Sequence, residues 1–203
     1  MQYGERFNSL THLFGTILAL IGAVALIRLA AQAGDPWKLA SFSVFSISMV
    51  LLYGASTLYH GSWGAIKQRL AKLDHCAIFV LIAGSYTPFT LVTLRGAWGW
   101  SLFGAIWGLA LLGIARELWW TRRPSPSVAL YVLMGWAGLC ALGPLHARLS
   151  SAGLLWLGLG AGLYTIGIVF YRLGKRWRHS HGVWHLFVLG GTASHFYTVL
   201  NFV

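Results

Sequence analysis

Long apolar runs with almost no charge constrain this chain more than any other feature of its sequence. Only 9% of its 203 residues are Asp, Glu, Lys or Arg, whereas 57% are hydrophobic and the mean hydropathy is +0.67. A water-soluble domain of this size needs a charged surface, and this composition does not supply one. The sequence therefore predicts an integral membrane protein of the all-α class.

Seven apolar stretches are long enough to cross a bilayer, since about 17–25 residues suffice for a helix. They are residues 12–32, 38–60, 74–94, 97–115, 126–145, 151–171 and 183–202. The connections between them are short, so we expect one polytopic seven-helix transmembrane domain over residues 1–203 and no separate soluble module.

The distribution of Lys and Arg predicts the orientation of this domain. Eleven of the 15 fall on the side of the N-terminus and four on the opposite side. Cytoplasmic loops carry the excess of positive charge, so we expect a cytoplasmic N-terminus and, after seven crossings, an external C-terminus. Basic loops also account for the net charge of +11, and we expect no nucleic-acid partner. The eleven residues are Arg6, Lys67, Arg69, Lys72, Arg116, Arg122, Arg123, Arg172, Lys175, Arg176 and Arg178.

Small residues and one proline predict how the helices pack. Gly104/Gly108 and Gly158/Gly162 have the small-xxx-small spacing of membrane helix contacts. Pro88, in "GSYTPF", is expected to kink the third predicted helix, because proline has no backbone N–H to donate.

Few polar side chains occur in the apolar segments, and the topology brings them to the cytoplasmic end. His60 closes the second predicted helix, in "GASTLYH", with Ser56 one turn deeper on the same face. Asp74 opens the third predicted helix, in "KLDHC", and His181 and His185 open the seventh, in "HSHGVWH". Three more polar residues precede or open the first predicted helix: Glu5, Asn8 and His12.

These residue types could form a zinc site. Catalytic zinc commonly has three protein ligands and one open position for water. His181 and His185 are four residues apart and share a helical face, and His60 could supply the third nitrogen. Asp74, as a carboxylate that does not ligate the metal, could hold the water and accept its proton, with Ser56 orienting it. Such a site suits hydrolysis of an amide or an ester.

Each residue also has a plainer interpretation. An HxxxH pair arises easily by chance in a chain with eight histidines, and a histidine at a membrane interface often contacts lipid headgroups. Asp74 could form an ion pair with Lys72 or cap a helix. Ionisable groups in membrane segments are costly and usually functional, which favours the joint interpretation.

Three other histidines are not expected in the metal site. His75 points about 100° away from Asp74 on the helix. His195 lies about 15 Å deeper than His185 and is suited to a hydrogen bond between helices. His179 belongs with the basic loop.

The polar strings together resemble the hemolysin III and progestin/adipoQ receptor family, in particular its bacterial hemolysin III branch. The resemblance rests on "GASTLYH", "KLDHCAIFVLIAGSYTPF" and "HGVWHLFVLGGTASHF", and it covers essentially the whole chain. It implies a multi-pass protein of the bacterial plasma membrane with seven helices and a cytoplasmic N-terminus. It also implies zinc on His60, His181 and His185, with Asp74 anchoring a water on the zinc and Ser56 nearby.

The resemblance also implies a chemistry: the adiponectin receptors of this family are proposed to hydrolyse the amide bond of ceramide. That reaction is similar to the one that the zinc site suggests. Hormone binding is not expected, because only a short segment precedes the first predicted helix. We expect membrane lipids as partners and a zinc-dependent hydrolase of a lipid amide or ester in membrane lipid homeostasis. Two alternatives stay open: a sensor of membrane state with a structural zinc and, more weakly, a haemolysin or channel.

Overall fold

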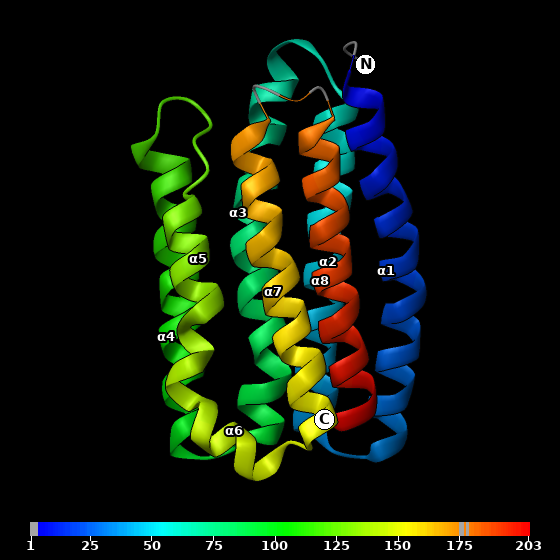
Figure 1. The fold of residues 1–203 in the computed structure, drawn as a ribbon, viewed down its shortest axis with the longest axis vertical. Coiled ribbons are helices and arrows are strands. Elements are labelled where there is room, and N and C mark those ends of the chain that lie inside the picture. The colour runs from blue at the N-terminus through cyan, green and yellow to red at the C-terminus, as the bar shows by residue number, and fades with distance from the viewer. Residues whose placement is uncertain (1–3, 175–176, 178) are drawn as a thin grey trace.

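The protein is described by a computed structural model covering residues 4–174, 177 and 179–203. It is a bundle of long helices that run along one common axis (Figure 1). The part described is helical, with no β-strand, which confirms the all-α prediction. The helices are α1 (Glu5–Ala33), α2 (Pro36–Gly61), α3 (Gly64–Pro88), α4 (Ala97–Ala115), α5 (Val128–Trp136), α6 (Leu142–Arg148), α7 (Ser151–Leu173) and α8 (Ser180–Phe202).

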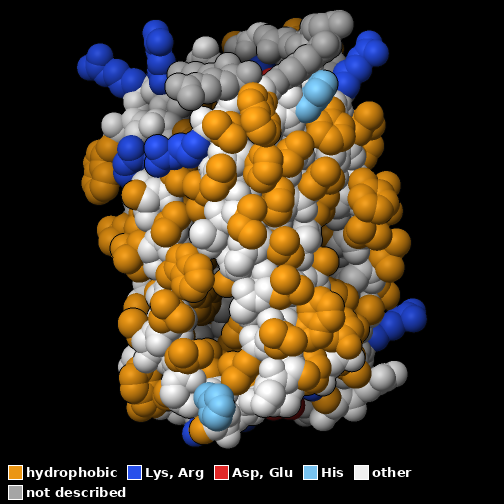
Figure 2. Space-filling view, in the orientation of Figure 1, with side chains coloured by type: hydrophobic (Ala, Val, Ile, Leu, Met, Phe, Trp, Pro, Cys, Tyr) orange, Lys and Arg blue, Asp and Glu red, His pale blue; other side chains and the backbone are white. Residues whose placement is uncertain are grey.

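Six helical stretches of the described chain have the length and hydropathy of a membrane span. They are Glu5–Ala33, Pro36–Gly61, Gly64–Thr93, Ala97–Trp120, Val128–Arg148 and Ser151–Leu173. Helix α8 is not among these six, although it lies lengthwise beside α7 and α1 in the same bundle (Figure 1). Lys and Arg side chains gather mainly at the end of the bundle that carries the N-terminus (Figure 2). Lys175, Arg176 and Arg178, which the predicted orientation also used, lie outside the described residues.

Two helices begin earlier than their hydropathy predicted. Helix α1 begins at Glu5, and α3 begins at Gly64, so Asp74 lies in the third turn of α3 instead of opening it. The prediction that Asp74 opens or caps a helix is therefore wrong. Residues 64–73, "GAIKQRLAKL", are rich in strong helix formers but too polar for a bilayer core, and a hydropathy criterion misses such a segment.

The fifth predicted span is interrupted. Helix α5 gives way to a 3₁₀ segment, Ala137–Ala141, before α6 begins. Pro144 cannot donate to the carbonyl four residues earlier, which disfavours a continuous α-helix here. The Tyr86 hydroxyl of α3 donates to the carbonyl of Gly135 and accepts from the N–H of Gly138, so it satisfies backbone groups at the break.

The third helix also changes at its proline. Helix α3 ends at Pro88 and continues as a π-helical turn, Phe89–Thr93. The Thr87 and Thr90 hydroxyls donate to backbone carbonyls of the preceding turn, at 2.8 Å to Ala83 and 3.1 Å to Tyr86. The proline therefore alters the helix where the sequence predicted a kink.

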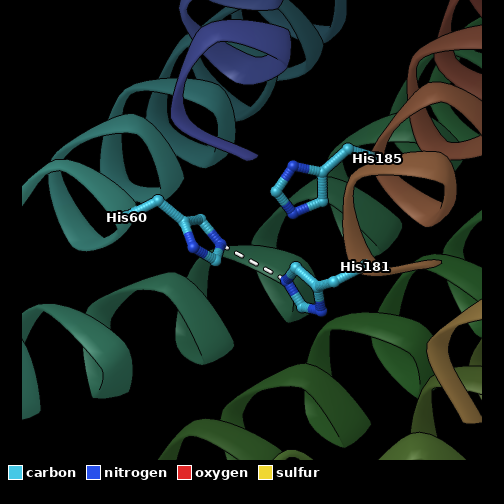
Figure 3. A group of neighbouring side chains, drawn as sticks. All are labelled: His60, His181 and His185. Atoms are coloured by element: carbon cyan, nitrogen blue, oxygen red, sulfur yellow. Dashed lines mark hydrogen bonds between the residues drawn. The ribbon is translucent and has the colours of Figure 1, made fainter. Parts of the chain in front are cut away.

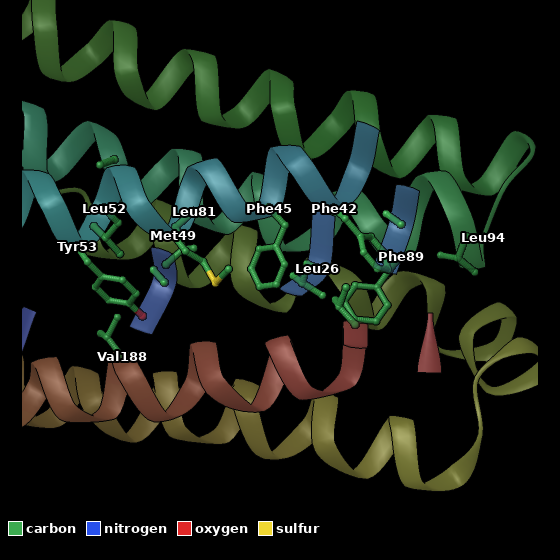
Figure 4. Packing of buried hydrophobic residues seen from close by; sticks show 14 of the residues in the cluster. Leu26, Phe42, Phe45, Met49, Leu52, Tyr53, Leu81, Phe89, Leu94 and Val188 are labelled. Carbon is green, nitrogen blue, oxygen red and sulfur yellow. The ribbon is translucent and has the colours of Figure 1, made fainter. Parts of the chain in front are cut away.

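The apolar core lies mainly between α1, α2, α3 and α8. Phe42 and Phe45 of α2 are fully buried and pack with Leu26 of α1 and Phe89 (Figure 4). Closer to the N-terminal end of the bundle, Tyr53 donates a hydrogen bond to Thr192 of α8 at 2.6 Å. This core holds the ends of α1, α2 and α8 together, where the polar residues lie.

The predicted glycine contacts are wrong. A Cβ added at Gly104, Gly108, Gly158 or Gly162 would meet nothing within 4 Å. Close approaches occur at other glycines, and at Gly99 a Cβ would collide with the carbonyl oxygen of Thr90. Spacing alone does not reveal which face of a helix meets its neighbour.

We expect Gly99→Ala to lower the stability of the protein by about 1–3 kcal/mol, because rigid backbone leaves the added methyl group no space. Thermal melting of the purified protein in detergent checks this. Gly104→Ala is the matched control in the same helix, and its melting temperature should stay the same or rise slightly. Equal melting of the two variants would contradict the packing at Gly99.

Candidate metal centre

Three histidines that lie far apart in the sequence meet at the N-terminal end of the bundle. His60 comes from the last turn of α2, and His181 and His185 from the first two turns of α8 (Figure 3). Each offers one ring nitrogen, and these three nitrogens lie within 4.8 Å of one another. Nε2 of His60 and Nε2 of His181 are 3.3 Å apart. The structure thus brings together the three residues that the sequence proposed as ligands.

The donor set fits a transition-metal ion. His60 and His185 are 2% and 0% exposed, and Nε2 of His185 is buried without a hydrogen-bond partner among the described residues. Three converging imidazoles suit zinc and other borderline metals rather than calcium or magnesium, which prefer oxygen. The cluster can therefore hold a metal ion.

Asp74 is buried in α3 and is not a member of the three-histidine cluster. It lines the same cavity as His181. The Ser56 hydroxyl, also buried, approaches the Asp74 carboxylate, but no hydrogen bond closes between them. The predicted roles of Asp74 as proton acceptor and of Ser56 as its orienting group remain predictions.

Glu5, Asn8 and Thr11 of α1 contact the histidine cluster directly. Glu5 accepts a hydrogen bond from His60 Nδ1 at 2.6 Å, and the carbonyl of Asn8 lies 3.1 Å from His185 Nδ1. The sequence placed Glu5 and Asn8 at the correct end of the molecule but gave them no role. The three-residue spacing of Glu5, Asn8 and Thr11 puts them on one helical face, and recognising this required the helix to begin at Glu5.

His75 lies closer to the site than the sequence predicted. It lines the same cavity as Asp74, and its Nδ1 is 2.9 Å from the buried carboxylate of Glu117. Adjacent helical residues point in different directions, but a wide cavity can be lined by both. Glu117 also accepts a hydrogen bond from the backbone N–H of Ser125 at 3.1 Å.

Two other histidines, His195 and His179, lie as predicted. His195 lies 3.3 Å from the carbonyl of Leu157, a hydrogen bond between α8 and α7. His179 is exposed in the turn before α8. His12 is buried, and its ring stacks on that of His185 with 3.6 Å between centroids and 9° between planes.

A cavity of about 620 Å³ adjoins the three-histidine cluster at His181. Asp74, His75 and His181 line one end, and Tyr86 and His195 line the other. Twelve residues of α3 separate Asp74 from Tyr86, which corresponds to about 18 Å along the helix. Between these ends the walls are largely apolar side chains of α3, α5, α7 and α8. The surface is hollowed between α5 and α7 (Figure 2).

Comparison with known proteins gives the family. A family model described as haemolysin-III related matches residues 2–196. The chain belongs to this family. It is 44% identical over 198 residues to the Hemolysin-3 homolog of Bacillus subtilis (strain 168), covering 97% of this chain and 92% of that protein. It is 41% identical over 201 residues to Hemolysin-3 of Bacillus cereus, covering 98% and 91%.

A more distant similarity extends to animals. The human Monocyte to macrophage differentiation factor is 26% identical over 210 residues, covering 99% of this chain and 85% of that protein. The resemblance drawn from the sequence is confirmed. Together with its apolar helices, the family makes this haemolysin-III-related chain a multi-pass integral membrane protein.

Proposed function

We propose that this haemolysin-III-related protein is a zinc-dependent hydrolase that cleaves an amide or ester bond of a membrane lipid. The observation that carries the proposal is one arrangement. Three imidazole nitrogens converge, and one of these histidines, His181, lines a largely apolar cavity together with the buried carboxylate of Asp74. A zinc held by these three residues would keep one coordination position open for a water or a substrate oxygen, as in catalytic zinc sites.

The roles of the residues follow from their chemistry. His60, His181 and His185 would hold the zinc, which when bound polarises the carbonyl and lowers the pKa of a water to about 7. Asp74 would accept the proton of the attacking water and pass it to the leaving nitrogen or oxygen. Ser56 would keep the Asp74 carboxylate oriented toward that water.

The cavity favours a lipid over a water-soluble substrate. Its volume of about 620 Å³ is in the range of small-molecule sites, and its length of about 18 Å suits an acyl chain. The hollow between α5 and α7 would admit a lipid from the side, with the scissile bond at the basic end of the bundle. In the orientation that the positive-inside rule gives, this end faces the cytoplasm, so the substrate would come from the cytoplasmic leaflet.

Metal content and lipid turnover test the proposal. We expect purified protein to contain near-stoichiometric zinc and to hydrolyse at least one member of a panel of fluorescent lipid amides and esters. The double variant His181→Ala/His185→Ala should lose both the zinc and the turnover, since one ligand remains. His146→Ala, at the opposite end of the molecule, is the matched control and should keep both. Absence of metal from the wild-type protein would contradict the site. So would metal retained in the His181→Ala/His185→Ala variant.

A sensor of membrane state with a structural zinc is the second candidate. The three-histidine cluster lies between the end of α2 and the start of α8, so a metal bound there would link these two helices. A purely structural metal would use the same arrangement. In that case chelation would lower the melting temperature strongly, while the protein would turn over no lipid of any headgroup.

A lytic or channel function is the weakest candidate. It is motivated by the name Hemolysin-3 of the Bacillus cereus relative. Leakage of liposomes that persists after all three histidines are replaced would favour it over the hydrolase.

A further inference from the structure

The first two turns of α1 lie against the three-histidine cluster. They contact the Nδ1 atoms of His60 and His185. Glu5, Asn8 and Thr11 occupy one face of α1, and their contacts are with α2 and α8. The close approach of α1 to α8 requires Gly182, because a Cβ there would collide with the ring of Phe7 and lie 3.0 Å from Oδ1 of Asn8.

Glu5 determines which nitrogen of His60 is free. Its Oε2 is 2.6 Å from Nδ1 of His60, and since an ionised carboxylate only accepts, Nδ1 must carry the proton. Nε2, which is 3.3 Å from Nε2 of His181, is then left with its lone pair facing the cluster. Asn8 Nδ2 donates to the same Oε2 at 2.8 Å, and Lys67 Nζ donates to Oε1 at 3.4 Å. The short contact with Asn8 holds Oε2, the oxygen that faces His60, whereas the longer contact of Lys67 reaches only the other oxygen.

The same helix determines the tautomer of His185. Nδ1 of His185 lies 3.1 Å from the carbonyl oxygen of Asn8, which can only accept a hydrogen bond. The Thr11 hydroxyl, 3.1 Å from the same nitrogen, already donates to that carbonyl at 2.8 Å, so it too faces Nδ1 as an acceptor. Nδ1 of His185 therefore carries the proton, and its buried Nε2 keeps a free lone pair. His12 stacks flat on the ring and limits its rotation.

We propose that Glu5 is a positioning residue for the metal, and that residues 5–12 of α1 preset two of the three ligands. This inference rests on the metal-binding part of the proposed function and not on hydrolysis. Histidine ligands bind a metal more tightly when a carboxylate or carbonyl holds the other ring nitrogen, because the partner fixes the ring and raises its basicity.

Zinc affinity of the purified full-length protein, measured by competition with a chelator, tests the role of Glu5. We expect Glu5→Ala to weaken zinc binding by about 10–100-fold. Glu5→Gln, which keeps an accepting oxygen but not the charge, should lie between Glu5→Ala and the wild type. The absorption bands of the cobalt-substituted protein should shift in both variants, because the His60 ligand changes. A simple loss of packing would not shift them.

Lys67→Gln is the matched control, because it removes the other charged partner of Glu5 and leaves the contact with His60. We expect its zinc affinity and cobalt spectrum to match the wild type. Melting of the metal-free proteins shows whether each variant folds. Wild-type affinity in Glu5→Ala, or an equal loss in Lys67→Gln, would overturn the assignment. Wild-type protein that binds no zinc would instead refute the proposed function itself.

Discussion

Replacing Asp74 by Asn is expected to lower lipid hydrolysis by at least about a hundredfold while the metal content stays at the wild-type level. Asn has nearly the same size as Asp but cannot accept a proton from the attacking water. Asp74 is buried beside the cavity and lies outside the three-histidine cluster, so its replacement removes no ligand. Turnover of the fluorescent lipid and zinc content, measured on the same preparation, check the prediction.

Asp35→Asn is the matched control for this change. Asp35 lies at the start of α2, far from His60 in its last turn. Its side chain accepts a hydrogen bond from the N–H of Trp37, and Asn can make the same contact. Its turnover and metal content should equal those of the wild type. Full activity of Asp74→Asn would refute the role of Asp74 as proton acceptor, and loss of metal in this variant would make Asp74 a ligand.

The second large effect is expected at Glu117. Glu117→Ala should destabilise the protein by about 1–3 kcal/mol, chiefly because the largely buried Nδ1 of His75 loses its acceptor, whereas Ser125 is exposed to water. Two donors lose their acceptor, Nδ1 of His75 and the backbone N–H of Ser125. Because Glu117 is 1% exposed, water cannot readily replace it. Melting in detergent, or urea denaturation, measures the change.

Glu117→Gln separates the hydrogen bonds from the charge. Gln retains an oxygen that can accept from both donors, so we expect it to recover most of the stability lost in Glu117→Ala. If both variants melted with the wild type, the His75–Glu117–Ser125 contacts would contribute nothing to stability.

Much of the metal centre could be predicted from the sequence, because its key spacings are local. His181 and His185 are four residues apart and lie on the same face of any helix that contains both. The number of membrane crossings places the end of α2 and the start of α8 at the same end of the bundle. The few polar residues of the predicted helices also indicated Asp74 and Ser56, and the resemblance to the family implied the same roles for them. The structure brings the three histidines together, but the chemistry assigned to them remains to be measured.

The contacts of Glu5 and His75 could not be predicted in this way. Glu5 precedes the first apolar run, and hydropathy does not show that α1 already begins there. The partner of His75, Glu117, lies 42 residues later in a π-helical turn at the end of α4. Such pairs depend on the rotation of each helix about its axis, which the apolar composition of a membrane helix scarcely encodes.

The sequence by itself determined that this chain crosses a membrane as helices, since an uncharged apolar surface is stable only in lipid. It also indicated that His60, His181 and His185 could meet, since helix length and the alternation of crossings place all three at the same end of the bundle. Only the tertiary structure decided which glycines bring helices close and which side chains hold the histidine rings. Those contacts depend on angles between packed helices, and a difference of one residue in register turns a side chain by about 100°.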